Sequence, residues 1–385
     1  MKILTLLHSL SIGGVEKTLY HCLPRLQSEG IEMTICCFEK GGNLEEDYKA
    51  KGVNVIYFKK TGSFLADFFQ LYKVAKNHQY DIIHSRLSYT SGGFALASRF
   101  LEIPFIVSIH NEFPATLIKW SKRPFFAQLR NLYLKIHKFF TKKYATLIVG
   151  HSRSNLDRNF PHWEASEQFK VLYNGVDFDY LTKKRDAIEE DFVKSYMNKL
   201  GENSFKMIHI GTFKEQKNHL FMLESFSMLN PVINNYHLIL LGDGELRKQI
   251  ENTVTKLKLH NNVHLIGFSK NVGAWIKQSD LFFFPSLFEG FANVIIEAQY
   301  LGLPICASKI KPHFESVHSY YHKYFFSSVD NEECVLKLTG IINDIQKGNI
   351  ANKTFEIKQH MNERFSINQM AKNLCDIYKK LISSS

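Results

Sequence analysis

The feature that most constrains the fold of this chain is an alternation of short apolar segments with helical patterns, which runs through the sequence twice. Apolar runs of about four to eight residues, rich in Val, Ile, Leu and Phe, are typical of buried strands. Here each is followed by a glycine or polar turn and then by apolar positions at helical spacing. The pattern predicts parallel sheets covered by helices, the doubly wound α/β class.

The two runs predict two domains. A chain of 385 residues exceeds one ordinary core. We expect an N-terminal domain over 1–180, a charged linker over 181–203 and a C-terminal domain over 204–365, with a closing amphipathic helix at 366–385. The expected strands are 2–7, 32–38, 53–58, 81–86, 104–110, 146–152 and 169–176 in the first run, and 205–213, 236–245, 262–268, 280–286 and 303–308 in the second.

Composition excludes several classes of protein. The six cysteines show no C-x-x-C spacing and lie mostly in apolar runs, which indicates reduced, buried thiols. The N-terminal apolar run is short and lacks a small-x-small cleavage site, so a first strand explains it better than a signal peptide. No run of about 18 uncharged apolar residues is present. We therefore expect a cytoplasmic protein.

The net charge of +11 is concentrated in one segment, 119–143, which contains no acid. Aromatic and aliphatic residues recur there at helical spacing, which predicts a basic amphipathic helix. A domain helix with a solvated face is one interpretation, and a helix that docks on an anionic membrane is another. Nucleic acid is disfavoured, because no recognition module accompanies the charge. The basic residues are Lys119, Lys122, Arg123, Arg130, Lys135, Lys138, Lys142 and Lys143.

Two glycine-containing loops follow expected strands of the second run. Tandem doubly wound domains bind ligands in a cleft at the carboxyl ends of their strands, so both loops are expected to line it. In LGDGE, Gly242 and Gly244 let the backbone approach a ligand, and Asp243 can accept its hydroxyl hydrogens. In GTFKEQKNH, Lys214 and Lys217 precede a helix, where a phosphate is favoured. Ordinary solvated loops remain an alternative for each.

Residues 285–304, PSLFEGFANVIIEAQYLGLP, place two glutamates eight positions apart. Glu289 lies at the turn before a helix, whose first turn has free backbone N–H groups for phosphate or sugar oxygens. Glu297 lies two turns on among apolar residues, where a carboxylate needs a polar partner such as ribose hydroxyls. A helix-terminal acid followed by a surface glutamate is the alternative on spacing alone.

The whole set of motifs resembles the retaining glycosyltransferases of family 4, which have the two-domain GT-B fold. The family motif is E-x7-E within P-S-x-x-E-G-F-G-x-x-x-x-E-A-x-A-x-G-x-P. SIGGVEK (11–17), YNGVD (173–177), GTFKEQKNH, GDGE and FSINQMAKNLCDIY resemble other family segments over nearly the whole chain. The branch that it most resembles builds capsular, exopolysaccharide or other lipid-linked glycans in bacteria. The matching positions of the motif are Pro285, Ser286, Glu289, Gly290, Phe291, Glu297, Ala298, Gly302 and Pro304.

The resemblance implies roles for matching positions. Glu289 would contact the donor sugar, Glu297 the ribose, and Lys217 the diphosphate, whose leaving charge it would stabilise. His110, at the end of a strand, would lie beside the donor sugar, although a satisfied strand-end histidine is the alternative. The other implied donor contacts are Gly13, Gly14, Thr212, Lys214, Gly242, Asp243, Gly244, Phe268, Gly290, Phe291, Ala292 and Asn293.

Two positions bear on activity and on metal use. The family phosphate loop usually has arginine where this chain has Thr212, which removes a bidentate phosphate contact that lysine replaces incompletely. Asp177 and Asp179 form a D-x-D at the expected domain junction rather than at a nucleotide-binding strand end, so no metal is implied. Helix N-termini and lysines would take its place.

The expected activity is metal-independent, retaining transfer of a hexose or N-acetylhexosamine from a nucleotide-diphosphate sugar, UDP before GDP, to a lipid-linked glycan. The donor is a substrate, and no cofactor is expected. The protein would work at the inner face of the plasma membrane, where the 119–143 segment docks on anionic lipid. The alternatives are a donor-binding subunit without turnover, which Thr212 favours, and a sugar-nucleotide epimerase on the same fold.

Overall fold

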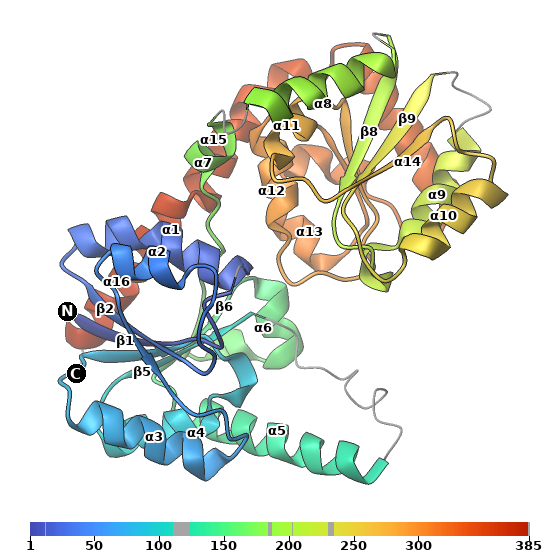
Figure 1. Cartoon of the computed structure of the whole chain (residues 1–385). Coiled ribbons are helices and arrows are strands. Elements are labelled where there is room, and N and C mark those ends of the chain that lie inside the picture. Colours follow the sequence, from blue (N-terminus) through green and yellow to red (C-terminus); the bar gives the residue numbers. More distant parts are fainter. Residues whose placement is uncertain (12, 111–123, 184–186, 202, 230–234, 384–385) are drawn as a thin grey trace. The chain divides into compact units, whose positions relative to one another are not determined.

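The computed structural model describes residues 1–11, 13–110, 124–183, 187–201, 203–229 and 235–383. Contacts divide the chain into two compact units (Figure 1). Unit 1 comprises Met1–Gly175 and Ile367–Ser385, and unit 2 comprises Val176–Ser366. The division differs from the expected one, because the segment 181–203 belongs to unit 2, where the charged helix α8 (Ala187–Lys199) packs against α11 (Val272–Lys277).

Unit 1 is a seven-stranded parallel sheet in the order β3-β2-β1-β4-β5-β6-β7. The order reverses direction between β1 and β4, so the fold is doubly wound as the sequence predicts. The elements are β1 (Lys2–Leu6), α1 (Gly14–Ser28), β2 (Glu32–Cys37), α2 (Glu45–Ala50), β3 (Asn54–Tyr57), α3 (Phe64–Lys76), β4 (Ile82–Ser85), η1 (Ser88–Thr90), α4 (Gly92–Phe100), β5 (Phe105–Ile109), α5 (Pro124–Tyr144), β6 (Leu147–Gly150), α6 (Arg153–Asn159), η3 (Trp163–Ala165) and β7 (Phe169–Val171).

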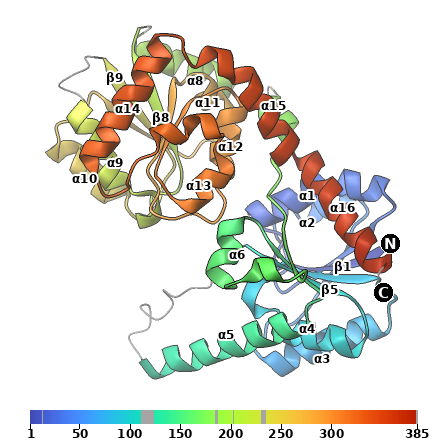
Figure 2. The ribbon, with the colours of Figure 1, turned by 180° about the vertical axis from the view of Figure 1, so that it is seen from behind.

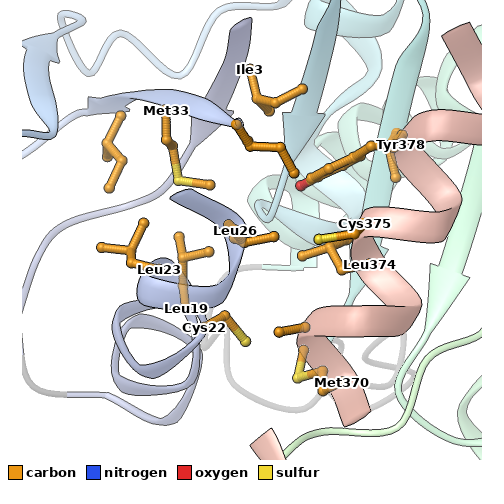
Figure 3. Packing of buried hydrophobic residues seen from close by; sticks show 14 of the residues in the cluster. Ile3, Leu19, Cys22, Leu23, Leu26, Met33, Met370, Leu374, Cys375 and Tyr378 are labelled. Carbon is orange, nitrogen blue, oxygen red and sulfur yellow. The ribbon is translucent and has the colours of Figure 1, made fainter. Parts of the chain in front are cut away.

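The C-terminal helix α16 (Ile367–Ser383) belongs to unit 1, where it packs against α1 (Figures 2 and 3). Its apolar face meets that of α1 through Leu374, Cys375 and Tyr378, which are buried (Figure 3). The Tyr378 hydroxyl lies 2.7 Å from His84 Nδ1, a contact between residues 294 positions apart. The last helix thereby closes the core over the first strand.

Unit 2 has a five-stranded parallel sheet in the order β10-β9-β8-β11-β12, which reverses between β8 and β11. The expectation of two doubly wound parallel-sheet units is therefore confirmed. The elements are α7 (Phe178–Thr182), α8, β8 (Phe205–Ile210), η4 (Glu215–Lys217), α9 (His219–Leu229), β9 (Tyr236–Leu241), α10 (Arg247–Lys256), β10 (Val263–Gly267), α11, β11 (Leu281–Phe284), α12 (Asn293–Tyr300), β12 (Ile305–Ala307), α13 (Lys311–Ser316), η5 (Ser319–Tyr324), α14 (Asn331–Gln346), η6 (Ala351–Lys353) and α15 (Thr354–Phe365).

Most strands of both sheets are buried on both faces, which explains why they form continuous apolar runs in the sequence rather than alternating ones. β3, β7 and β10, at the edges of the sheets, are partly exposed. β11, with the sequence LFFF, is fully buried, and so is β9. All six cysteines are buried free thiols, and burial raises the pKa of each. The expectation of reduced core cysteines agrees with this packing.

Candidate active site

The best-defined polar site in unit 2 lies where its sheet order reverses. The loop after β8 carries Lys217, and the loop after β11 carries Glu289. These strands are neighbours in the sheet, so parallel geometry brings their carboxyl-end loops together. Lys217 Nζ lies 2.7 Å from Glu289 Oε1, and their side chains are 15% and 6% exposed. The two residues that the sequence placed 72 positions apart thus form one nearly buried ion pair.

Gln216, which the sequence did not single out, completes this pair. Its Nε2 donates to Glu289 Oε2 over 3.1 Å and to the Phe288 carbonyl over 2.9 Å. The backbone carbonyl of Gln216 accepts a hydrogen bond from the Leu287 amide over 2.9 Å. Both carboxylate oxygens of Glu289 therefore have partners. Lys214 and Lys217 indicate a phosphate loop from the sequence, but residue type does not single out Gln216, which lies in η4 between them.

The charge of Lys217 acts on three histidines, His209, His219 and His313. Lys217 Nζ also lies 4.6 Å from the centre of the Phe284 ring. Burial is the largest cause that lowers the pKa of His219 and of His313 to about 4, and it lowers that of His209 well below the usual value. At neutral pH these rings carry no charge that would repel a cation. Ring nitrogens of all three lack hydrogen-bond partners among the residues that the structure describes.

Close backbone packing requires glycine at both glycine positions of the GDGE turn. Gly242 has a φ of +149°, and a Cβ on it would lie 2.0 Å from the Gly211 carbonyl oxygen. A Cβ on Gly244 would lie 2.7 Å from the Phe213 carbonyl oxygen. The two loops are therefore pressed together backbone to backbone. The expected ligand contacts of Gly242 and Gly244 stay a prediction beside this structural role.

Neighbouring polar groups of the same edge are mostly exposed. Asp243 accepts from the Gly244 amide over 2.7 Å and pairs with Arg247 Nη1 at 3.3 Å. Thr212 and Lys214 are exposed at the start of the η4 loop. Phe268, which follows β10, is 83% exposed, and the preceding Gly267 accepts a hydrogen bond from Gly242. An exposed aromatic side chain thus lies next to the GDGE turn.

The loop before α12 holds the remaining expected donor contacts. Ala292 is the N-cap of α12 and provides no side-chain cap, and Asn293 begins the helix. Phe291 packs its ring 5.7 Å from that of Phe365. Glu297 lies in the same helix with a half-buried side chain, and Gly290 directly follows the paired Glu289.

Unit 1 carries the other predicted residues at the carboxyl edge of its own sheet. Gly13 is the N-cap of α1 and Gly14 its first residue. His110 follows β5, and its ring stacks on His151 with centres 4.3 Å apart. Burial is the main cause that lowers the pKa of both imidazoles, to about 3 for His151, and the charge of Arg86 adds to it. His110 is therefore neutral, and its Nε2 has no partner within the described ranges.

The D-x-D segment serves the local fold. Asp177 caps α7, because its Oδ1 accepts from the Tyr180 amide over 2.7 Å. The described residues contain no group of three or more His, Cys, Asp and Glu side chains with the arrangement of a metal site. Metal independence remains a prediction.

The basic helix exists as α5, and four of its apolar residues face outward, whereas Leu134 is buried. Leu129, Leu132, Ile136 and Phe139 are 40–59% exposed, whereas His137 and Thr141 turn inward. Arg130, Lys135, Lys142 and Lys143 are exposed, and Lys138 is half-buried against the Phe160 ring. Lys119, Lys122 and Arg123 lie outside the described residues. Within the described ranges no helix has the length and apolar character needed to span a bilayer.

The chain matches two family models that meet near the boundary of the two units. Residues 12–180 match Glycosyltransferase Family 4, and residues 193–355 match Glycosyl transferases group 1. It is 26% identical over 357 residues to the UDP-Gal:alpha-D-GlcNAc-diphosphoundecaprenol alpha-1,3-galactosyltransferase of Escherichia coli, with 89% of each chain covered. It is 24% identical to the capsular polysaccharide biosynthesis glycosyltransferase CapH of Staphylococcus aureus, with 98% of each covered.

Solved structures share the fold of the whole chain. A glycosyltransferase from Rickettsia africae superimposes with a TM-score of 0.81 at 18% identity, covering 100% of this chain and 99% of the other. The Anabaena protein HepE in complex with UDP gives a TM-score of 0.79 at 19% identity, covering 99% and 100%.

An uncharacterized glycosyltransferase of Methanocaldococcus jannaschii is 34% identical over 200 residues, which are 50% of this chain and 48% of that one. The chain belongs to the family 4 glycosyltransferases and has the GT-B fold.

Proposed function

We propose that this glycosyltransferase transfers a hexose or N-acetylhexosamine from a nucleotide-diphosphate sugar, UDP before GDP, to a lipid-linked glycan. The observation that carries the proposal is the ion pair between Lys217 and Glu289 at the switch point of unit 2. The pair joins a cation, which would bind the diphosphate, and a carboxylate, which would bind the sugar hydroxyls, over 2.7 Å. Donor binding would exchange that pair for contacts with the ligand.

Each partner of the pair has a separate task in the proposed reaction. The bond between the sugar and the diphosphate breaks, and the Lys217 ammonium stabilises the negative charge that develops on the leaving oxygen. Glu289 accepts hydrogen bonds from sugar hydroxyls and fixes the sugar's orientation. The acceptor hydroxyl forms the new bond on the same face, and its proton passes to the leaving phosphate. This order retains the anomeric configuration and uses no metal.

The relatives support the choice of substrates. The E. coli relative is named for a UDP-galactose donor and a diphosphoundecaprenol-linked acceptor. HepE has been solved with UDP and with UDP-glucose. Phe268 provides an exposed ring beside the GDGE turn on which a nucleobase can stack.

We further propose that α5 holds the enzyme on the membrane that carries its acceptor. The helix presents exposed Leu132 and Phe139 together with exposed Arg130, Lys135 and Lys143. Apolar side chains enter the headgroup boundary, and each basic residue near anionic lipid adds about 1 kcal/mol. Nucleotide sugars are metabolites of the cytoplasm, so the proposed donor favours the inner leaflet.

Nucleotide release tests the proposed activity. The purified protein is incubated with UDP- and GDP-sugars and a membrane extract, with and without EDTA. We expect UDP release from one donor, unchanged by EDTA, and a loss of about a hundredfold or more in Lys217→Met. Lys256→Met, which removes an exposed lysine of α10, is the matched control and should keep full activity.

Two results would change the proposal. Release that disappears with EDTA would contradict metal independence. Binding of UDP without release from any donor would favour a donor-binding subunit, and Thr212→Arg would then test whether the absent phosphate-loop arginine is the reason.

A further inference from the structure

Gln216 binds the loop after β11 through both its side chain and its backbone. Its Nε2 donates to the Phe288 carbonyl over 2.9 Å and to Glu289 Oε2 over 3.1 Å. Its backbone carbonyl accepts from the Leu287 amide over 2.9 Å. A primary amide has two N–H bonds, so both hydrogens of Nε2 have partners. The side chain is therefore fixed in one direction, toward the carboxylate.

Asn218, on the other side of Lys217, fastens the same loop independently. Its Nδ2 donates to the Ser328 carbonyl over 2.9 Å and to the Pro285 carbonyl over 3.3 Å. Its φ is +58°, a left-handed conformation that asparagine adopts more readily than most residues with a side chain. Both neighbours of Lys217 hold the η4 backbone without using the lysine side chain. The lysine can therefore change partners while the loop stays in place.

The two oxygens of the Glu289 carboxylate have partners of different kinds. Oε1 accepts from the Lys217 ammonium over 2.7 Å, whereas Oε2 accepts from the neutral amide of Gln216 over 3.1 Å. The Glu289 side chain is 6% exposed, so the loss of both partners would leave a nearly buried charge without compensation. Loss of the lysine alone leaves one hydrogen bond in place. The geometry therefore allows one oxygen to be released while the other stays bound.

A neutral donor suits this position better than a cation. A lysine or arginine in place of Gln216 would form a second ion pair with Glu289 and would itself attract a diphosphate. The amide does neither, because it carries no charge. It orients the carboxylate and leaves the negative charge available for hydroxyl groups, with which a carboxylate forms strong hydrogen bonds.

We propose that Gln216 is a positioning residue that holds Glu289 by Oε2 throughout the reaction, so that Oε1 alone exchanges Lys217 for a sugar hydroxyl. The proposal rests on the proposed function, in which Lys217 moves to the diphosphate and Glu289 binds the sugar. When the lysine leaves, Oε1 is free to accept a hydrogen bond from the sugar. The bond from Gln216 keeps the plane of the carboxylate fixed, and with it the orientation of the sugar.

Steady-state kinetics of nucleotide release, together with calorimetric titration of UDP, separates positioning from binding. Gln216→Met keeps the length of the side chain and removes both donors, so we expect kcat to fall between about tenfold and about a hundredfold. The Kd of UDP, which has no sugar for Glu289 to orient, should stay unchanged. Gln216→Glu should lower kcat further, because a second carboxylate repels Glu289. Gln249→Met removes an exposed glutamine of α10 and is the matched control, with unchanged kcat.

Three results of these measurements would overturn the proposal. A wild-type kcat in Gln216→Met would show that Glu289 does not need the amide. An equal fall in kcat and in UDP affinity would show that the glutamine only supports the fold of the loop, since Lys217 lies in that loop. Equal losses of kcat in Gln216→Met and Gln216→Glu would indicate altered packing rather than a lost hydrogen bond to Glu289.

A crystal structure of the wild-type protein with UDP tests the same role without turnover. The proposal predicts that Lys217 Nζ has moved to the diphosphate while Gln216 Nε2 still donates to Glu289 Oε2. A carboxylate that has turned away from Gln216, with the diphosphate at Lys217, would overturn the proposal and leave the proposed donor site intact. A diphosphate bound elsewhere would overturn both. If no UDP-sugar releases nucleotide, the proposed activity fails, and this structure still decides the role of Gln216.

Discussion

Gly242 shows how single residues in unit 2 are fixed by backbone packing. Its φ of +149° is unfavourable for any residue with a side chain, and a Cβ would lie 2.0 Å from the Gly211 carbonyl oxygen. The neighbouring atom is backbone, which cannot rotate away. The loop that carries Lys217 therefore depends on a glycine of a different loop.

Replacement of this glycine should be costly. Gly242→Ala is expected to lower the free energy of unfolding by about 2 kcal/mol or more, because strain at a special backbone conformation adds to the clash. Gly340→Ala is the matched control, because that glycine lies within α14 and nothing lies within 4 Å of an added Cβ. Gly340→Ala should raise the free energy of unfolding by about 0.5–1 kcal/mol. Urea unfolding measures both, and a Gly242→Ala protein as stable as the wild type would contradict the packing argument.

The residues of the candidate site were predictable to different degrees. Glu289 and Lys217 were found because both follow buried strands and match a specific motif, and the structure places them 2.7 Å apart. Gln216 could not be predicted, because its partners Phe288 and Glu289 lie 72 and 73 positions away in the sequence.

Among the elements, α5 departs most from an ordinary domain helix. A surface helix usually turns its apolar stripe inward, but here Leu132 and Phe139 are 56% and 59% exposed, while the polar His137 and Thr141 are buried. The sequence predicted the helix and its period correctly. The sequence alone could not show which face of α5 is buried, because that depends on how α5 packs against α4.

Vesicle binding tests α5. The wild-type protein should sediment with phosphatidylglycerol vesicles and less with phosphatidylcholine vesicles. The double variant Leu132→Ser, Phe139→Ser should bind anionic vesicles about tenfold more weakly, since two apolar anchors leave the interface. Phe355→Ser removes a 79% exposed ring of α15 in unit 2 and should bind as the wild type does. Equal binding by the α5 variant would exclude this helix as the anchor.

The bounds of the units could be predicted only in part. Both α/β runs were found from their alternation, since strands buried on both faces stand out as apolar runs. The segment 181–203 was interpreted as a linker because of its charge, yet α8 buries Val193 and Met197 in unit 2. Two apolar residues one turn apart are a weak signal within a charged segment.

At the scale of the whole molecule, buried histidines make stability depend on pH. Burial lowers the pKa of five of them to between about 3 and about 4, whereas in the unfolded chain they titrate near 6.5. Below pH 6.5 the unfolded state binds more protons, so stability falls as pH falls toward 4. Asp67 opposes this, because burial raises its pKa to about 7 and protonation favours the fold. The five are His137, His151, His219, His264 and His313.

Urea unfolding at pH 7 and pH 5 measures this effect. Each histidine lowers the free energy of unfolding by at most about 2 kcal/mol between pH 7 and pH 5. We therefore expect the free energy of unfolding to be a few kcal/mol lower at pH 5. His219→Phe should reduce the difference, because a phenyl ring fits between the rings of Phe213 and His209 and does not titrate. Equal or greater stability at pH 5 would contradict the account.

The central claim is that the Lys217–Glu289 pair marks the donor site. A crystal structure of the protein with UDP tests it most directly. The account predicts that the diphosphate lies within hydrogen-bond distance of Lys217 Nζ, near the first turn of α12, and that the lysine has left Glu289 Oε1. A diphosphate bound elsewhere, with the 2.7 Å ion pair intact, would contradict it.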